Sequence, residues 1–340
     1  MSKKNSSVNL KNYFQDDDDL SKVYLDFKIK LDKIKKKSFI VGVSGGPDSM
    51  ALAALSKAYS FEKKNKFYFV HIDHNLRKNS FKEANKIKKK LKNFKINLII
   101  LSNKTKIKKN IQSNARNIRY EMLTNFCKKK KISTVLTAHH REDQVETFFI
   151  RLSRGSGLKG LSSMKKITEL VGKVRLHRPL LETKKKLLTK ITKSVFGNYI
   201  KDPSNKNRKF LRTKIRDLEK PLQKSGINYD QIIRSINNLA SSENIVDKYF
   251  RSVSKEITKK SKSEIKINFD KFKYLESEIK IRLINESIKK IKKNYYNPRS
   301  KKVINLIKNL EEKKFKKMTL GGCVISRKNG EISLKIEKLH

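Results

Sequence analysis

The chain has 340 residues, enough for two or three domains that each bury a sizeable core. Lys and Arg together number 84 against 32 Asp and Glu, and the formal net charge of +52 far exceeds what solubility requires. This balance favours a polyanionic partner, in the first place nucleic acid. Lys, Asn and Ile are abundant throughout, so solvated surface lysine is a second explanation for part of the charge.

Cysteine usage and hydropathy exclude several classes of protein. The two cysteines, Cys127 and Cys323, belong to no Cys-x-x-Cys pair, which argues against a disulfide framework, a zinc knuckle and an iron–sulfur cluster. No apolar run approaches the roughly 20 residues of a membrane span, and the amino terminus has no signal-peptide core. We therefore expect a cytoplasmic protein with no membrane partner. Residues 1–20, which include the acidic run Asp16–Asp19, are expected to be a flexible end.

The first predicted strand-to-helix turn carries a glycine motif. Residues 39–43 are apolar and β-branched, typical of a buried strand, and residues 50–55 favour helix. Between them lies "SGGPDS" at 44–49. The first N–H groups of a helix have no intrahelical partner, so a turn without bulky side chains can hold phosphate oxygens there. The motif lacks the Gly-Lys-Ser/Thr of a Walker loop and the glycine spacing of a dinucleotide fingerprint.

This turn resembles the pyrophosphate loop (PP-loop) of the N-type ATP pyrophosphatases, which cleave ATP between the α and β phosphates. Glycine gives the backbone its freedom, and Pro47 suits a first helical position. Asp48 lies beside the expected anion, which implies a bridging cation. The residues expected to bind ATP here are Ser44, Gly45, Gly46, Pro47, Asp48 and Ser49. A packed glycine turn without a ligand is the alternative.

Strand-like and helical segments then alternate, which predicts an α/β fold with an open parallel sheet and crossover helices. The segments expected as strands are 67–76, 96–102 and 133–140, and those expected as helices are 81–94 and about 114–130. Ligands of such sheets collect beyond the carboxyl ends of the strands. The polar residues that fall there, besides the glycine turn, are Asp73, His74, His139 and His140.

Two carboxylates follow the histidine pair. Asp143 and Glu146 are three residues apart near the start of a predicted helix, so they share one face, and Glu142 is placed to join them. Clustered carboxylates are suited to hold Mg²⁺ or to accept a proton from an attacking amine. Acids in a first helical turn also complement the helix dipole, but that alternative leaves the preceding histidines unexplained.

Several blocks in order resemble the tRNA(Ile)-lysidine synthetases, over about residues 38–221. They are "SGGPDS" at 44–49, "HIDHNLRKNS" at 71–80, "ARNIRY" at 115–120, "TAHHREDQVET…RLSRGSGLKGLSSM" at 137–164, "RPLL" at 178–181 and "DPSNKNRKFLRTKIR" at 202–216, with a looser echo at 318–336. There are two departures. Glu142 stands where the family usually has Asp, and Thr213 where it usually has Asn.

The resemblance implies a ligase that joins free L-lysine to C2 of the wobble cytidine in the CAU anticodon of tRNA(Ile). ATP adenylates the cytidine, and pyrophosphate and AMP are released. It implies a PP-loop catalytic domain over 21–221 and a basic, helix-rich α+β tRNA-binding domain over 222–340 that ends in a small β-hairpin region. Residues 229–257 show helical spacing, and Asn329-Gly330 predicts the hairpin turn. The sequence does not decide between monomer and homodimer.

The family also suggests roles for individual residues. Asp48 and Asp143 are expected to bind Mg²⁺, and Asp143 with Glu146 to position the lysine. Three arginines are expected to stabilise the α phosphate or guide the cytidine, namely Arg116, Arg119 and Arg212. His71 and His140 are expected near ATP, with a hydrogen-bonded core histidine as the alternative for His71.

Two functions from other classes are alternatives. A tRNA thiolase built on the same loop needs catalytic or cluster-binding cysteines, and the two cysteines here have no such arrangement. A non-catalytic RNA-binding protein with a vestigial loop is disfavoured because Asp48, Asp143 and Glu146 are all present.

Overall fold

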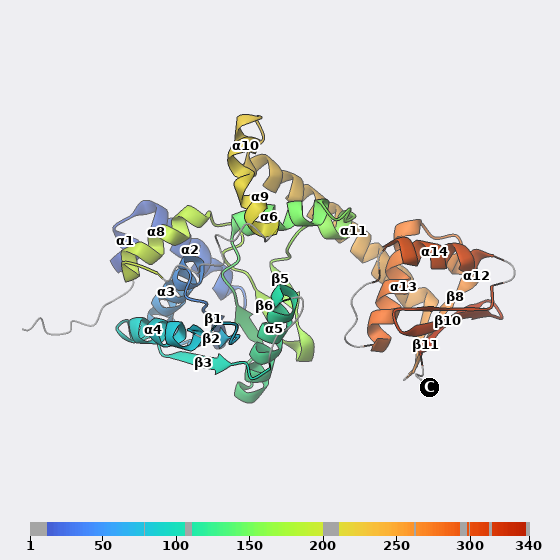
Figure 1. Ribbon diagram of the computed structural model, residues 1–340, viewed down its shortest axis with the longest axis horizontal. Helices are drawn as coiled ribbons and strands as arrows, with labels where there is room; N and C mark the ends of the chain where they lie inside the picture. Colours follow the sequence, from blue (N-terminus) through green and yellow to red (C-terminus); the bar gives the residue numbers. More distant parts are fainter. Residues whose placement is uncertain are drawn as a thin grey trace, which may run out of the picture. The chain divides into compact units, whose positions relative to one another are not determined.

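The computed structural model describes residues 12–77, 79–105, 111–199, 211–261, 263–292, 298, 300–312 and 315–337. The chain divides into two units, Met1–Ala240 and Ser241–His340, each with a hydrophobic core of its own (Figure 1). Among the described residues, no helix combines the length and the apolar character that a bilayer crossing needs.

The first unit is built on a six-stranded sheet with the order β3-β2-β1-β4-β6-β5. Its parallel strands are β1 Ser38–Gly42, β2 Lys66–Asp73, β3 Leu98–Ser102, β4 Thr134–Leu136 and β6 Arg175–His177, and β5 Ile167–Glu169 is an antiparallel edge strand. The expected α/β fold with an open, mostly parallel sheet is confirmed.

Helices cover both faces of this sheet because its central strand is apolar on both sides. In β1, Phe39 and Val41 join one buried cluster with residues of α2, α3, α4 and α8. Ile40 points the other way and packs with residues of α5. These helices are α2 Asp18–Asp32, α3 Pro47–Glu62, α4 Ser80–Lys92, α5 Ile111–Lys130 and α8 Lys185–Phe196.

Further helices complete the first unit. They are α6 Arg141–Leu152, α7 Leu158–Leu161, η1 Val171–Lys173, α9 Leu211–Asp217, α10 Glu219–Lys224 and the beginning of α11 Tyr229–Ile257. Val145 of α6 packs against Ile232 and Ile236 of α11. The expected long helix at 229–257 is confirmed. Of the family block at 202–216, residues 202–210 lie outside the described part of the chain.

The expectation of a flexible amino-terminal end does not hold for residues 12–20. Asn12–Gln15 forms α1, and Phe14 and Leu20 are buried in the main core. Asp17 caps α2 by accepting the N–H groups of Asp19 and Leu20, and it pairs with Lys190. Apolar burial and the helix cap explain the order of this segment, and residues 1–11 lie outside the described range.

The second unit packs helices on a five-stranded antiparallel sheet with the order β7-β8-β11-β10-β9. The elements are β7 Thr258–Lys260, β8 Glu264–Asn268, α12 Phe269–Phe272, α13 Ser277–Lys292, α14 Ser300–Glu311, β9 Lys317–Leu320, β10 Cys323–Lys328 and β11 Glu331–Ile336. Asn329 and Gly330, with φ of 50° and 71°, form the expected hairpin turn between β10 and β11. The expected α+β class is confirmed, and the sheet is larger than a hairpin.

Candidate active site

The glycine loop lies between β1 and α3, and its conformation depends on Gly45. This residue has φ of +90°, and a Cβ there would lie 2.4 Å from Ile87 Cδ1 of α4. Pro47 occupies the first turn of α3, as expected, and no side chain caps the helix. The N–H groups of this first turn therefore face outward, as a phosphate site requires.

Part of the loop backbone is already hydrogen-bonded by Ser49. The Ser49 hydroxyl oxygen accepts the N–H groups of Ser44 at 3.0 Å and of Gly45 at 3.1 Å, and the hydroxyl donates to the Gly46 carbonyl at 3.0 Å. Two of the N–H groups that were expected to meet phosphate thus hold the loop together. The donors left for an anion are those at the beginning of α3.

His140 lies between the carboxylates of two elements. Its Nε2 is 3.6 Å from Asp48 Oδ2 and 3.5 Å from Asp143 Oδ2, and its Nδ1 is 3.1 Å from Glu142 Oε2. The side chain is 2% exposed. Burial opposes the charged imidazole, but the three carboxylates outweigh it and raise the pKa of His140 to about 10. The structure thus brings Asp48, Asp143 and His140 together at the ends of β1 and β4.

The beginning of α6 explains how these side chains are held. The His140 N–H donates to Asp143 Oδ2 at 3.1 Å, an N-terminal cap that fixes the Asp143 side chain. Glu142 turns away from the glycine loop, and its carboxylate accepts the Lys185 N–H at 2.9 Å and 3.1 Å. The longer side chain that departs from the family pattern therefore links α6 to the beginning of α8.

Glu146 lies one turn further along α6, and its carboxylate pairs with two arginines of α9. Arg216 Nε and Nη2 lie 2.5 Å and 3.3 Å from its two oxygens. Arg212 Nε lies 3.0 Å from Glu146 Oε2. The carboxylate is 2% exposed, and a buried charge of this kind requires paired neighbours. The structure therefore brings Glu146 and Arg212 together, in an ion-pair cluster that also contains Arg216.

The chemistry of this site fits Mg²⁺. Asp48 Oδ1 is buried and has no hydrogen-bond partner in the described part of the chain. Within the same ranges, no group of three or more His, Cys, Asp or Glu side chains is arranged to hold a metal ion by itself. Mg²⁺ is commonly bound through one or two carboxylates together with substrate phosphates and water. Asp48 and Asp143 are residues of the right type for that arrangement.

The other histidines occupy distinct environments. His71 Nδ1 is 2.9 Å from the Val43 carbonyl and supports the strand before the loop. Burial, and then the charge of Arg119, lower the pKa of His74 to about 4. Burial likewise lowers the pKa of His139 to about 3, with Arg116 and Arg212 among the charges that add to the effect. Both rings are thus favoured in their neutral form near pH 7.

The two arginines expected from "ARNIRY" lie on α5. The Arg116 guanidinium lies 5.0 Å from the centre of the Tyr120 ring, and both Arg116 and Arg119 are exposed. The charge of Arg116 contributes to the lowered pKa of His139. Their role in catalysis stays a prediction.

Sequence reasoning missed residues that shape the site from behind. Gln144 exchanges two hydrogen bonds with the backbone of Met164, and Arg151 donates to the carbonyls of Gly160 and Ser163 at 2.6 Å and 2.8 Å. These contacts dock the 153–164 loop on α6. Arg178 is buried and donates to the Lys165 carbonyl at 2.7 Å. All three residues lie inside the family blocks, so their place in these blocks could have marked them. Their partners are backbone groups, which no sequence motif reveals.

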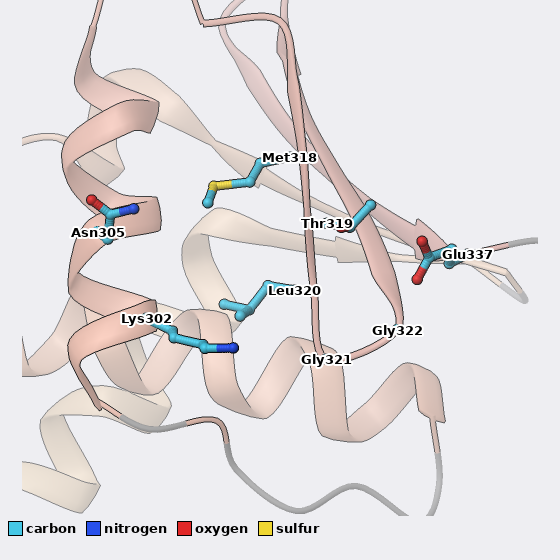
Figure 2. Close-up of a pocket in the computed structure, with 8 residues that line it drawn as sticks. All are labelled: Lys302, Asn305, Met318, Thr319, Leu320, Gly321, Gly322 and Glu337. Carbon is cyan, nitrogen blue, oxygen red and sulfur yellow. The ribbon is translucent and has the colours of Figure 1, made fainter.

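A separate cavity of about 350 Å³ lies in the second unit and contains none of the expected site residues. Figure 2 shows Lys302 and Asn305 on α14 facing Met318 and Leu320 of β9, with the Gly321-Gly322 turn at one end. A smaller cavity of about 200 Å³ adjoins Gly45 in the first unit.

Comparison with known proteins agrees with this geometry. Residues 19–221 match the model of the PP-loop domain family, so the fold and the site define a nucleotide-binding protein of the PP-loop class. The chain is 34% identical over 305 residues to the tRNA(Ile)-lysidine synthase of Wolbachia pipientis. This match covers 88% of this chain and 70% of that protein. The chain belongs to the tRNA(Ile)-lysidine synthase family, as its sequence blocks predicted.

Two further similarities have narrower meaning. The chain is 42% identical over 183 residues to the tRNA(Ile)-lysidine synthase of Orientia tsutsugamushi, a match that covers 54% of this chain but only 41% of that protein. A U34-tRNA thiolase from Methanococcus maripaludis shares the fold with a TM-score of 0.56 and 18% identity, over 66% of this chain and 79% of the thiolase. The second similarity shows the fold alone.

Proposed function

We propose that this chain ligates free L-lysine to C2 of the wobble cytidine in the CAU anticodon of tRNA(Ile), at the expense of ATP. The single observation that carries the proposal is the placement of Asp48 and Asp143 against His140, where the glycine loop meets the end of β4. This places two carboxylates beside a helix N-terminus suited to a triphosphate. The names of the relatives support the same substrate.

The reaction has two group transfers. In the first, the C2 carbonyl oxygen of cytidine attacks the α phosphorus of ATP, an O–P bond forms, and pyrophosphate leaves as the bond between the α and β phosphates breaks. In the second, the ε-amino group of lysine attacks C2, and AMP leaves with the former carbonyl oxygen. The amine loses protons to a base and to solvent.

The residues suit these steps. The beginning of α3 binds the triphosphate through its outward N–H groups. Mg²⁺, when bound by Asp48 and Asp143, neutralises charge on the phosphates. We assign Asp143 the task of orienting the lysine amine, which gives up its proton to a nearby carboxylate or to solvent. Arg212 and the arginines of α5 stabilise charge that develops on the α phosphate.

Glu146 was expected to position the lysine together with Asp143, and we propose a different task for it. Both of its oxygens lie against arginines, so it is not a free acceptor for an amine in this arrangement. We assign it the task of anchoring α9, and we assign contact with lysine to Asp143.

tRNA is the partner that the charge supports, and ATP is the co-substrate that the PP-loop supports. The thiolase alternative gains no support from the cysteines. Cys127 and Cys323 are both buried, and burial raises the pKa of the Cys127 thiol to about 11, which disfavours the reactive thiolate.

A pyrophosphate-release assay separates the candidate functions. The ligase is expected to release pyrophosphate only with tRNA(Ile), and to release AMP as well when lysine is added. A thiolase would release AMP only when a sulfur donor, and not lysine, is added, and a binding protein would release no pyrophosphate. Pyrophosphate release that does not depend on tRNA would contradict the proposal.

A further inference from the structure

We infer that Arg216 is a positioning residue, which fixes Glu146 in a two-pronged ion pair and thereby leaves Arg212 to serve the substrate's α phosphate. The inference rests on the proposed function. Arg216 belongs to the last of the family blocks, but it was not among the residues expected at the site.

The two arginines do not bind Glu146 in the same way. Arg216 reaches both carboxylate oxygens through Nε and Nη2, the geometry in which an arginine satisfies a carboxylate most fully. Arg212 approaches through Nε at 3.0 Å, and this buried nitrogen makes no hydrogen bond in the described part of the chain. The carboxylate is thus committed to Arg216, while Arg212 adds a charge that is less well matched.

The charges around the pair agree with this division. One carboxylate cannot neutralise two guanidinium groups, so the cluster keeps an excess positive charge. The Arg212 side chain is 40% exposed and the Arg216 side chain 31% exposed, so Arg212 is the less enclosed of the two guanidinium groups and the more open to an anionic phosphate.

The length of α9 makes an anchor necessary. Within the described part of the chain this helix spans seven residues, Leu211–Asp217, too few to be stable alone. Arg212 and Arg216 are one turn apart on the face toward α6. A fixed pair between Glu146 and Arg216 therefore determines where the Arg212 side chain begins, and a shift of about 1 Å at a reacting group is enough to slow catalysis.

A double-mutant cycle on pyrophosphate release tests the inference. Arg212→Gln is expected to lower kcat by about 10²- to 10³-fold, as for other lost transition-state contacts. Arg216→Gln is expected to lower kcat by about tenfold or more with little change in KM for ATP. The double variant is expected to be no slower than Arg212→Gln alone, because Arg216 acts through Arg212. Two effects that multiply in the double variant, or full activity of Arg216→Gln, would overturn the inference.

Two further variants separate positioning from mere stability. Arg216→Lys keeps the charge but loses the fork, so it is expected to recover the melting temperature and not the rate. Glu146→Gln is expected to match Arg216→Gln in rate. Recovery of the full rate by Arg216→Lys would show that charge alone suffices. Arg251→Gln is the matched control, since Arg251 is exposed on α11 and, within the described residues, pairs with Asp247 four positions earlier.

A second readout needs no activity, so it keeps this inference apart from the proposed function. In urea unfolding, the coupling between Glu146 and Arg216 is expected to exceed the coupling between Glu146 and Arg212. If no tRNA elicits pyrophosphate release from the wild-type protein, the proposed function fails, and this cycle still decides which arginine holds Glu146. Equal couplings would refute the division of roles.

Discussion

Gly45 shows how one residue fixes the geometry of the loop. Its φ of +90° is a conformation that L side chains rarely adopt, and Ile87 fills the space where a Cβ would project. Gly46, the next residue, has φ of −74° and only the Ser44 hydroxyl at 3.9 Å from the ideal Cβ position. The backbone at position 45 therefore requires glycine, whereas the backbone at position 46 does not.

The first prediction follows from this difference. Gly45→Ala is expected to lower the free energy of unfolding by about 1–3 kcal/mol, through backbone strain and overpacking against Ile87. Gly46→Ala, the matched control, is expected to cost less than about 1 kcal/mol. Urea unfolding measures both. Equal costs at the two positions would contradict the loop geometry.

A second prediction concerns His74. Both ring nitrogens are buried without a hydrogen bond in the described part of the chain. Burial first, and then the charges of Arg119 and His71, depress the folded-state pKa to about 4, and Asp73 only partly opposes this. For a base with a depressed pKa, the unfolded chain takes up the proton first, so stability is present above about pH 6.5 and is lost as pH falls toward 4.

The expected size of this effect is about 2 kcal/mol between pH 7.5 and pH 5.0. It is measured as the loss of unfolding free energy in the wild type minus the loss in His74→Phe, which cannot take up a proton. A difference near zero would mean that His74 is protonated equally well in both states.

At the scale of single residues, the sequence predicted the positions that depend only on neighbouring residues in the chain. Pro47 at the first turn of α3 and Asp143 at the first turn of α6 follow from spacing alone. Ser49 was expected to bind ATP, which stays a prediction; that its hydroxyl accepts the Ser44 and Gly45 N–H groups could not be predicted, because this contact depends on how the backbone turns. The pairing of Glu146 with Arg216 joins residues 70 positions apart, which no local pattern specifies.

At the scale of elements, α6 is the helix that organises the site. Asp143 contacts His140, which also lies against Asp48 of α3. Glu146 pairs with α9, Glu142 reaches α8, and Gln144 holds the 153–164 segment. The beginning of α6 therefore connects the carboxylates of the proposed site to the neighbouring helices.

The third prediction tests the link between α6 and α8. Glu142→Ala removes the acceptor for the Lys185 N–H and for His140 Nδ1, and it is expected to cost about 1–3 kcal/mol of unfolding free energy. Glu169→Ala, on the exposed edge strand β5, is the control and is expected to stay within about 0.5 kcal/mol of wild type. Equal stabilities of the two variants would show that Glu142 does not bridge the helices.

Elements with strong periodicity were predictable, and short ones were not. The strand at 39–43 and the hairpin at Asn329-Gly330 have clear apolar and turn signals. The strands β5, β6 and β7 have three residues each, too few for a period to show, whereas the equally short β4 was predicted because it lies within the longer segment expected at 133–140. Ile265 and Ile267 alternate with polar residues as in a half-buried strand, but β8 pairs with β11 across a long separation in sequence, so its place in a sheet could not be predicted locally.

At the scale of the whole molecule, the net charge of +52 predicts tight, salt-sensitive binding to RNA. The lysines of the second unit include exposed ones at the end of α13 and the beginning of α14, namely Lys289, Lys290, Lys301 and Lys302. Each lysine that contacts a phosphate is expected to contribute about 0.9 to the slope of log affinity against log salt.

The fourth prediction uses these lysines. Replacing all four with Gln is expected to weaken tRNA binding and to reduce the salt slope by about one unit or more. The control replaces Lys63 and Lys64, which follow the last residue of α3 and lie about 24 Å from the loop at its beginning. Filter binding at several salt concentrations measures both slopes. An unchanged slope for the four-lysine variant would remove the second unit from tRNA recruitment.

The most direct measurement of the central claim is mass spectrometry of nucleosides from tRNA(Ile) incubated with the protein, ATP and isotopically labelled lysine. The account predicts one modified cytidine, whose mass equals that of cytidine plus the labelled lysine minus one water. It is expected to form only when ATP is present and not to form with Asp48→Asn. Unmodified cytidine under all conditions, or a label that enters tRNA without ATP, would contradict it.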